Sequence, residues 1–246
     1  MSDPGLRCKA LEVGYLGKAI LPKIDLEIRP GEFWAVIGRN GSGKTTWLRT
    51  LLGLLPPVAG AVVRTPPQLR FSYLPQRKAI DELYPLFARD VVRMGLERNW
   101  SFLRPRLNGE PPEVEQALAE MGVADLGDTP YRKLSEGQKQ RVLFARLAVS
   151  HAQVAVLDEP TSAMDKVAEH EAFQLLDGLR QRQGLAIVIV SHFLGMVEQF
   201  ADRALLLDRD TQSVVSGPPH EVFSHETFHR RFSERPPAIV EEGEHV

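Results

Sequence analysis

The stretch that constrains the fold most is residues 38–45, which read Gly-Arg-Asn-Gly-Ser-Gly-Lys-Thr. Two glycines separated by four residues and followed by Lys and a hydroxyl residue form the pattern of a phosphate-binding loop. The apolar run 33–37 before the loop predicts a strand, and leucines with the spacing of one helix face follow it, at Leu48, Leu51, Leu52 and Leu55. In this context the loop amides and the helix N-terminus favour bound phosphate. We expect a nucleotide site in which Lys44 reaches the β- and γ-phosphates and the Thr45 hydroxyl binds Mg²⁺.

A second strong signal lies at residues 153–160, which read Gln-Val-Ala-Val-Leu-Asp-Glu-Pro. An apolar strand that ends in two acids is typical of a buried parallel strand, which delivers carboxylates to the sheet edge where α/β proteins bind ligands. There Asp158 can hold Mg²⁺ directly or through water, and Glu159 could accept a hydrogen bond from an attacking water. The alternative is a pair of solvated acids that opens a turn, which the phosphate loop disfavours.

Three further residues follow predicted strands, and each keeps two interpretations. Tyr15 can pack at a strand end, or its ring can stack on adenine. Gln76 can be a polar loop residue, or its amide can contact a metal ion and a water. His192 can be a hydrogen-bonded loop residue, or it can donate to a γ-phosphate.

The segment 134–138, Leu-Ser-Glu-Gly-Gln, precedes a long helix-like run. Ser135 and Gln138 have the spacing of a capping box, which starts a helix. The same segment could also form a second anion site from the Ser135 side chain and the Gly137 N–H at a helix N-terminus. Further along the chain, Asp165 is placed to cap the helix that follows it.

The remaining pattern indicates an α/β core with a helical insertion. Strands are predicted at residues 6–13, 19–28, 32–37, 71–74, 185–190, 204–207 and 214–217. The helix after the phosphate loop is expected to stop at Pro56-Pro57, because proline cannot continue a helix interior. Residues 81–132 contain no strand-like run and predict a helical subdomain. For His225 and His229, a solvated histidine face is favoured over a metal clamp.

The composition limits the partners and the compartment that we expect for the chain. A net charge of −2 gives no general reason to expect nucleic-acid binding. The single cysteine, Cys8, cannot form an internal disulfide and fits a reducing cytosol. Residues 1–5 lack the layout of a signal peptide. The longest aliphatic run, 185–190, is far shorter than the ~20 residues that span a bilayer, so any membrane role is expected to come through a partner.

Taken together, these stretches resemble the ATP-binding subunit of ATP-binding cassette (ABC) transporters over residues 6–223. Many NTPases share the phosphate loop, whereas the pentapeptide 134–138 is discriminating. The matching motifs appear in the order Tyr15, the Walker A loop 38–45, Gln76, the signature 134–138, Walker B ending at Asp158 and Glu159, the segment Ser162-Ala163-Met164-Asp165, and His192.

The resemblance implies a fold and a division of the chain. The expected fold is a P-loop NTPase (RecA-like) α/β core with an N-terminal antiparallel β subdomain and an inserted α-helical subdomain. The core and β subdomain would take residues 1–80 and 140–217, and the helical subdomain with the signature would take residues 81–139. Residues 218–246 would form a C-terminal helix and a loose acidic tail.

The resemblance also implies a role for each matched residue. Tyr15 would stack on the adenine of ATP, and the phosphates would lie on Gly38, Arg39, Asn40, Gly41, Ser42, Gly43, Lys44, Thr45 and Thr46. Mg²⁺ would contact Thr45, Gln76 and Asp158. Glu159 would polarise the hydrolytic water, and the catalytic set would be completed by Lys44, Gln76 and His192. The working unit would contain a second subunit, expected to be another copy of this chain. ATP bound to that subunit would be contacted in trans by Ser135, Glu136, Gly137, Gln138 and Asp165.

Two residues depart from the family pattern. Glu136 stands where the usual signature has Gly, and an acid that pointed at the triphosphate would weaken closure of the dimer. We expect the Glu136 side chain to point away from the triphosphate, because the backbone N–H of Gly137 is the group that donates a hydrogen bond to the phosphates. Met164 replaces the usual Leu, which conserves volume and is expected to have little effect.

The expected partners are transmembrane permease subunits and a substrate-binding protein, with no nucleic acid. A cassette without a fused membrane-spanning segment is similar to a prokaryotic importer subunit, which would sit peripherally at the cytoplasmic face of the cell membrane. The segment 87–95, Phe-Ala-Arg-Asp-Val-Val-Arg-Met-Gly, is similar to the same segment in importers of zinc, manganese and iron chelates. We therefore expect an ATPase that drives uptake of a metal ion or chelate.

Two alternatives from other classes stay open. One is a soluble cassette ATPase that serves iron–sulfur cluster assembly, against which only the segment 87–95 argues; the other is an ABC subunit for a different substrate. Translation-associated cassette proteins are disfavoured because they carry two cassettes in one chain. A regulator that only binds nucleotide is disfavoured by the presence of Glu159 and His192.

Overall fold

The computed structural model describes residues 5–76, 85–96, 111–162 and 164–232. Its strands are β1 (Gly5–Glu12), β2 (Gly14–Tyr15), β3 (Lys18–Ala19), β4 (Ile24–Ile28), β5 (Phe33–Ile37), β6 (Ala59–Thr65), β7 (Phe71–Leu74), β8 (Val154–Asp158), β9 (Ala186–Val190), β10 (Arg203–Asp208) and β11 (Ser213–Gly217). Its α-helices are α1 (Lys44–Leu52), α2 (Ala88–Arg93), α3 (Pro112–Glu120), α4 (Glu136–Val149), α5 (Lys166–Gln183), α6 (Leu194–Phe200), α7 (Pro219–Ser224) and α8 (Glu226–Phe232).

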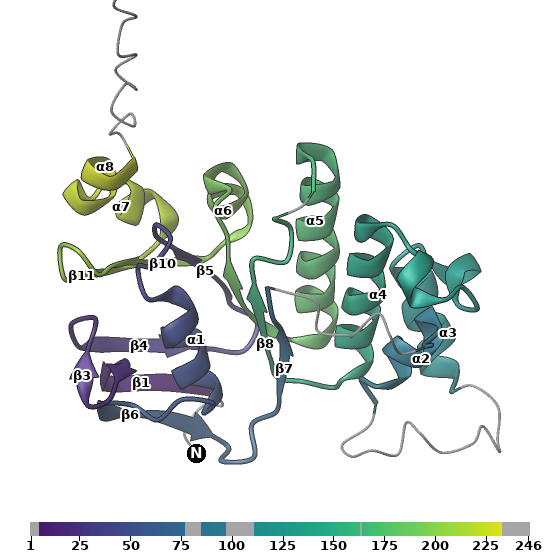
Figure 1. Ribbon diagram of the computed structural model, residues 1–246, viewed down its shortest axis with the longest axis horizontal. Helices are drawn as coiled ribbons and strands as arrows, with labels where there is room; N and C mark the ends of the chain where they lie inside the picture. Colours follow the sequence, from purple (N-terminus) through teal and green to yellow (C-terminus); the bar gives the residue numbers. More distant parts are fainter. Residues whose placement is uncertain (1–4, 77–84, 97–110, 163, 233–246) are drawn as a thin grey trace, which may run out of the picture.

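A six-stranded sheet runs through the middle of the molecule in the order β11-β10-β5-β9-β8-β7 (Figure 1). All neighbours pair in parallel except β10 and β11, which form an antiparallel hairpin. The strands β5, β8 and β9 are buried at every position. Continuous burial is expected for central parallel strands that are covered on both faces. The predicted α/β core is confirmed.

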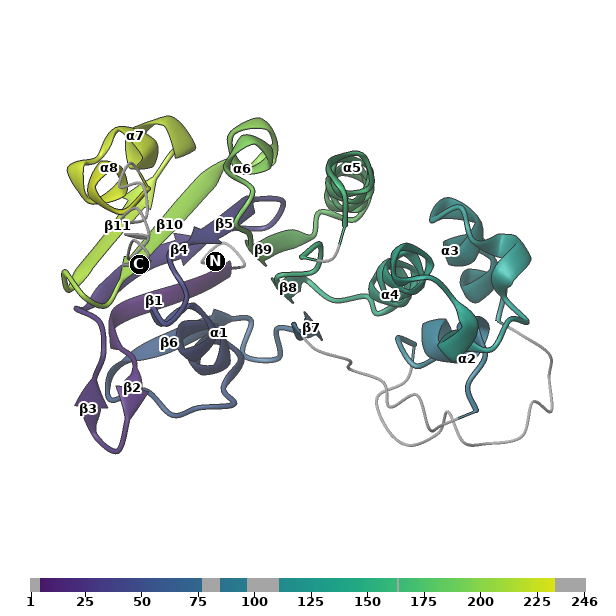
Figure 2. The ribbon, with the colours of Figure 1, turned by 45° about the horizontal axis from the view of Figure 1, so that its top comes forward.

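The alternation of side chains along β5 divides the interior into two hydrophobic clusters. Phe33, Ala35 and Ile37 point into the cluster that the helices α2 to α6 cover. Trp34 and Val36 point the other way, into a cluster with α1 and the N-terminal strands. Successive side chains of a strand face opposite sides, so one apolar run supplies both layers. The phosphate-loop helix α1 is thereby held between the central sheet and the N-terminal strands (Figure 2).

The N-terminal strands form a three-stranded antiparallel sheet in the order β4-β1-β6, as the fold class implies. The strand β6 was absent from the sequence-based prediction. It pairs with β1 in a register that sets Cys8 opposite Val62. In the sequence, Gly60 and the prolines on either side of the run 59–65 favour a turn. The run forms a strand because it pairs with β1.

Two predicted element boundaries are wrong. The strand expected over residues 19–28 is interrupted, because β3 ends at Ala19 and β4 begins only at Ile24. Pro22 lies in the gap and has no N–H to give to a strand ladder. The helix α1 ends at Leu52, before the prolines, because Gly53 adopts φ 77° and caps it in the left-handed conformation.

Helices α2, α3 and α4 gather beyond β7 and β8, on the side of the sheet away from α1 (Figures 1 and 2). Their shared interior includes Val91, Leu118 and Val142, all of which are fully buried. The helices α2 and α3 show the predicted helical character of this part, and outside them Phe87 forms an isolated β-bridge with Pro130. The predicted boundary between residues 139 and 140 falls inside α4, and the division into subdomains stays a prediction.

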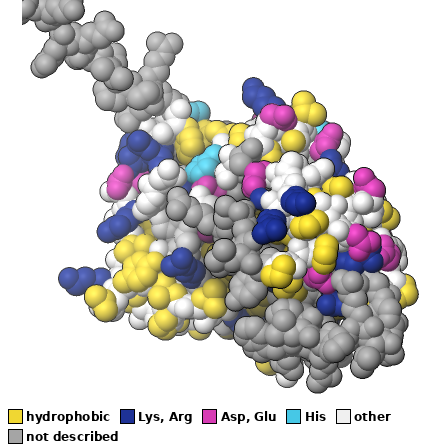
Figure 3. All heavy atoms as spheres, turned by 45° about the vertical axis from the view of Figure 1, so that its right-hand side comes forward, with side chains coloured by type: hydrophobic (Ala, Val, Ile, Leu, Met, Phe, Trp, Pro, Cys, Tyr) yellow, Lys and Arg dark blue, Asp and Glu magenta, His cyan; other side chains and the backbone are white. Residues whose placement is uncertain are grey.

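The C-terminal part contains two short helices, α7 and α8, rather than one. The rings of Phe223, Phe228 and Phe232 stack along them. The acidic end of the expected tail, residues 241–246, lies outside the described residues. No helix within the described ranges is long and apolar enough to cross a membrane. On the face shown in Figure 3, acidic and basic side chains are interspersed among hydrophobic ones.

Candidate nucleotide site

The loop between β5 and α1 has the backbone that its glycines predict. Gly38, Gly41 and Gly43 have φ values of 148°, 80° and 102°, which other residues rarely adopt. Gly38 is also confined by its surroundings, because a Cβ there would lie 2.4 Å from the Leu207 carbonyl oxygen and 2.6 Å from Ser42 Oγ. The glycines therefore let the loop turn beside the end of β10.

The side chains of this loop present unsatisfied donors and a buried cation. Lys44 Nζ donates to the carbonyl oxygens of Gly38 at 2.7 Å and Arg39 at 3.0 Å. Burial lowers the pKa of Lys44, although the carboxylates of Glu159 and Asp158 act in the opposite direction. Ser42 Oγ is buried and has no hydrogen-bond partner in the structure. A buried polar group without a partner fits a site that is completed by a polar ligand.

Thr45 and Asp158 meet at the point where α1 begins and β8 ends. Thr45 Oγ1 donates to Asp158 Oδ2 at 3.2 Å. Burial raises the pKa of Asp158, and the hydrogen bond from Thr45 offsets part of that effect. A hydroxyl, a carboxylate and the nearby Gln76 amide provide hard oxygen ligands of the kind Mg²⁺ takes. Mg²⁺ needs only a few protein ligands when phosphate oxygens complete its shell, so these residues fit that ion.

Glu159 is held between two side chains from the ends of neighbouring strands. Gln76, after β7, donates from Nε2 to Glu159 Oε2 at 2.5 Å. His192, after β9, places Nε2 at 2.6 Å from Glu159 Oε1. Glu159 itself has φ 51°, an unusual value for a residue with a side chain, and such backbone strain gathers at functional sites. Of the four residues that the sequence analysis placed in catalysis, Gln76 and His192 are thus in direct contact with Glu159, and Lys44 lines the same pocket.

Tyr15 lines the same pocket as Glu159. Its hydroxyl lies 3.1 Å from Thr46 Oγ1, and the residue is 49% exposed. An aromatic ring that is fixed at one end and open on a face can stack on a planar base. The geometry is compatible with the adenine-stacking interpretation of Tyr15.

One pocket of about 780 Å³ joins these parts. Predicted site residues that line it are Tyr15, Asn40, Gly41, Gly43, Lys44, Thr45, Thr46, Gln76, Glu159 and His192. Three lining residues, Lys18, Ile20 and Arg209, were missed by the sequence analysis. They lie outside the family motifs, and only the folding of β3 and the β10–β11 turn against the loop brings them to the pocket. Gly38, Arg39, Ser42 and Asp158 support the pocket through the contacts described above.

The signature residues are not part of this pocket. Ser135 caps α4 as predicted: Ser135 Oγ accepts from the Gln138 N–H at 3.3 Å, and the Ser135 N–H donates to Gln138 Oε1 at 2.9 Å. A Cβ added at Gly137 would meet open space. Glu136 is exposed and accepts a hydrogen bond from Lys139 Nζ at 2.8 Å, further along the same helix. The N-terminus of α4 is thus open to a partner surface.

Asp165 has the structural role that the sequence predicts. Asp165 Oδ1 caps α5 by accepting from the amides of Val167 at 3.0 Å and Ala168 at 2.8 Å. Met164 packs against the core, and Ala163 lies outside the described residues. No group of three or more His, Cys, Asp or Glu side chains that could hold a metal ion occurs in the described ranges, which include His225 and His229.

Comparisons with known proteins identify the family. The model of the ABC transporter family matches residues 21–162. The zinc import ATP-binding protein ZnuC of Pseudomonas putida is 36% identical over 98% of this chain and 88% of its own length. ZnuC of Halorhodospira halophila is 34% identical over 94% of this chain and 84% of its own length.

Solved structures of ABC transporter subunits also resemble this chain. A metal-chelate type ABC transporter in an inward-facing conformation is 26% identical, with a TM-score of 0.79 over 94% of this chain and 90% of that one. The subunit cbiO1 of Clostridium perfringens, part of the ABC transporter complex cbiONQ, is 25% identical, with a TM-score of 0.77 over 94% of this chain and 97% of that one. The chain therefore belongs to the ABC transporter family, as an ATP-binding subunit with ATPase activity.

Proposed function

We propose that this chain hydrolyses ATP to drive a membrane permease that imports a metal ion, with zinc as the favoured cargo. The observation that carries the ATPase part is the clamp on Glu159, which unites the ends of β7, β8 and β9 at the phosphate loop. The cargo is supported by the relatives, which are zinc importers at 34–36% identity over nearly the whole chain. A manganese ion or an iron chelate is the nearest alternative cargo.

In this proposal Lys44 and the loop amides bind the phosphates, and the open face of Tyr15 takes the adenine. Thr45, Asp158 and Gln76 hold Mg²⁺, which neutralises charge on the phosphates when bound. Glu159 accepts a proton from the attacking water, and His192 donates from Nε2 towards the γ-phosphate. Catalysis is then positioning and electrostatic stabilisation by groups that the fold fixes in advance.

Gln76 and His192 have two roles in this mechanism. In the structure both contact Glu159, so they hold its carboxylate at the end of β8. With nucleotide and Mg²⁺ bound, the Gln76 amide would hold the metal and His192 would donate to the phosphate, which would leave Glu159 free to accept a hydrogen bond from the water. Hydrolysis is thereby coupled to occupation of the pocket.

The working unit in this proposal is a head-to-tail dimer of two copies of the chain. The N-terminus of α4 carries Ser135 and Gly137, beside which an added Cβ would meet open space, and these residues would close over ATP bound to the other copy. Asp165 would cross the same interface. Glu136 is drawn towards Lys139, so it leaves the Gly137 N–H accessible. The dimer would act at the cytoplasmic face of the membrane, on permease subunits served by a substrate-binding protein.

The experiment that tests this proposal is capture of partners from native membranes. Tagged Glu159→Gln protein, which is expected to hold ATP without hydrolysing it, would be recovered with ATP from gently solubilised membranes and its partners identified by mass spectrometry. Recovery of a multi-span membrane protein supports the proposal. Recovery of soluble iron–sulfur assembly proteins alone would contradict it. Glu198→Gln, an exposed Glu on α6, is the matched control for the substitution.

A further inference from the structure

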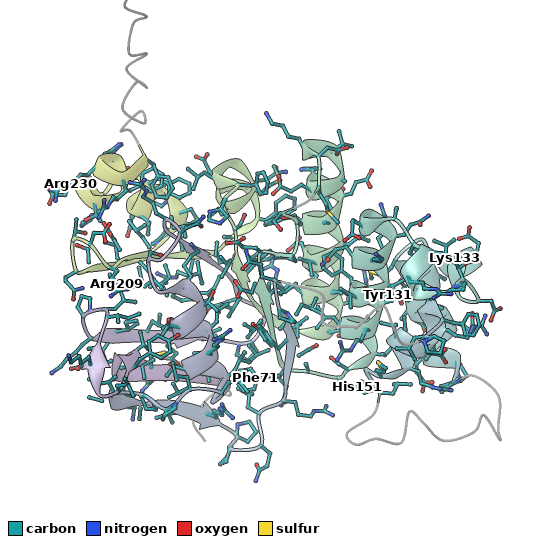
Figure 4. The ribbon with its side chains drawn as sticks, in the orientation of Figure 1. Phe71, Tyr131, Lys133, His151, Arg209 and Arg230 are labelled. Carbon is teal, nitrogen blue, oxygen red and sulfur yellow. The ribbon has the colours of Figure 1, made fainter. Side chains whose placement is uncertain are left out.

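The rim of the nucleotide pocket carries a cation that no motif includes. Arg209 lies in the turn between β10 and β11 (Figure 4). It lines the pocket together with Tyr15 and Lys18. Its side chain is exposed, and it forms no ion pair within the part of the chain that the structure describes. An unpaired guanidinium at a pocket rim is available to an anionic ligand.

The turn that carries Arg209 is fixed by its neighbours. Gln212 has φ 49° and donates from its backbone N–H to the Arg209 carbonyl oxygen at 3.3 Å, which closes the turn. Its side-chain Nε2 donates to the same oxygen at 2.7 Å and to the Ile20 carbonyl oxygen at 3.1 Å. Since Ile20 also lines the pocket, Gln212 ties the turn directly to the pocket wall.

Two acids flank Arg209 in the sequence, yet neither pairs with it. Asp208 and Asp210 instead bind Arg231 of α8, which donates to Asp208 Oδ1 at 3.0 Å and to Asp210 Oδ2 at 2.9 Å. Asp208 is 5% exposed and accepts further hydrogen bonds from Thr211 and from the Asp210 amide. Arg231 therefore neutralises the two charges that would otherwise attract the Arg209 side chain and repel phosphate.

We propose that Arg209 binds the phosphate chain of the nucleotide, and that Arg231 positions it by holding Asp208 and Asp210 away. This inference rests on the proposed function of the pocket as an ATP site. It assigns the C-terminal helix α8 a role in nucleotide affinity. Planar guanidinium groups bind phosphate oxygens with strong charge-assisted hydrogen bonds, so Arg209 adds a guanidinium to the two lysines, Lys18 and Lys44, that line the pocket.

The first test measures nucleotide affinity of Arg209→Gln by titration with ATP, ADP and AMP. ATP binding is expected to weaken about 5- to 10-fold, AMP binding to weaken less, and the salt dependence of ATP binding to become shallower. The matched control is Arg203→Gln, an exposed Arg at the other end of β10 that lines a different pocket. Unchanged ATP affinity, or equal losses for ATP and AMP, would overturn the inference.

The second test asks whether Arg231 acts through Arg209. In the wild-type background Arg231→Gln is expected to weaken ATP binding about 2- to 5-fold, and in the Arg209→Gln background to change it little. Arg231→Lys should restore part of the affinity. The control is Arg230→Gln, the neighbouring residue, which pairs with Glu226 of the same helix and is exposed (Figure 4). Equal losses in both backgrounds would show a merely structural role for Arg231 and overturn the coupling.

Two further outcomes separate this inference from the proposed function. If the wild-type protein binds ATP and Lys44→Ala does not, the site is a nucleotide site whatever Arg209 does, and only the inference depends on the titrations. If Arg209→Gln leaves the affinity of the monomer intact and impairs only ATP-dependent dimerisation, Arg209 contacts the partner subunit and the phosphate contact is overturned. If the wild-type protein fails to bind ATP, both the proposed function and this inference are overturned.

Discussion

His192 Nε2 lies 2.6 Å from Glu159 Oε1, although the two residues are far apart in the sequence. Adjacent parallel strands, β8 and β9, deliver them to the same edge of the sheet. A carboxylate oxygen accepts a hydrogen bond here only from a His192 tautomer that has its proton on Nε2. The sheet topology thus brings the proposed base and the proposed donor side by side, next to the phosphate loop.

Glu159→Gln should abolish hydrolysis while preserving nucleotide binding. The amide cannot take a proton from water, and loss of a general base typically lowers the rate about 10²- to 10⁴-fold. The amide keeps the size of the carboxylate and can still bond to Gln76 and His192. Steady-state ATP hydrolysis and an ATP titration on the same preparation measure both quantities. An undiminished rate would remove Glu159 from the role of base.

His192→Ala should lower kcat more than it weakens ATP binding. In the proposed mechanism His192 donates to the γ-phosphate as charge develops there, and loss of one such donor costs about 10²- to 10³-fold in rate. His192→Gln, which retains a donor, should recover part of the loss. Equal effects on the ATP dissociation constant and on kcat would instead assign His192 to ground-state binding.

Gly38→Ala should destabilise the protein and weaken ATP binding. The added Cβ would come within 2.4 Å of the Leu207 carbonyl oxygen, so the loop or β10 must shift. We expect a loss of about 1–3 kcal/mol in the free energy of unfolding. The control is Gly184→Ala, where φ is 65° but a Cβ meets open space. A loss at Gly38 no larger than that at Gly184 would mean that the close approach has no energetic weight.

Glu169 should make the stability of the fold depend on pH. This residue of α5 is 2% exposed, and its Oε1 accepts a 3.4 Å hydrogen bond from Thr161. Burial raises the pKa of Glu169 from 4.5 to about 7, against the smaller opposite effect of Thr161. The folded state therefore binds a proton more tightly than the unfolded state does, and the stabilisation is complete below the unfolded pKa and lost as the pH rises through 7.

Glu169→Gln removes this titration. Relative to the wild type, its free energy of unfolding should rise by roughly 1–3 kcal/mol between about pH 5 and about pH 8. Chemical denaturation at several pH values measures the difference, with Glu198→Gln as a control that changes an exposed Glu. Parallel pH profiles for the wild type and Glu169→Gln would show that Glu169 titrates normally in the folded protein.

The motif residues and their strands could be predicted because local patterns encode them. Local patterns identify the apolar run 33–37 as a strand and the glycines and Lys of the loop 38–45 as a phosphate site. The acids at 158–159 are recognised in the same way, because they directly follow an apolar run. The capping box at Ser135 and the N-cap at Asp165 follow from nearest-neighbour chemistry in the same way. These features depend on residues a few positions apart, so the sequence displays them directly.

Features that depend on distant residues were not predictable. The strand β6 exists because β1 pairs with it, and Arg209 reaches the pocket because Gln212 bonds to Ile20, which is far away in the sequence. The early end of α1 shows a competition between two local signals, in which the left-handed Gly53 stops the helix before Pro56 can. Tertiary contacts and turn conformation decide such cases.

The most direct test of the central claim is metal uptake in cells that lack this chain. Cells would be supplied with the wild-type chain, Glu159→Gln or Glu198→Gln at equal expression, and zinc accumulation followed with time. We predict that the wild type and Glu198→Gln restore uptake, whereas Glu159→Gln does not. Uptake that is unaffected by loss of the chain, or fully restored by Glu159→Gln, would contradict the account.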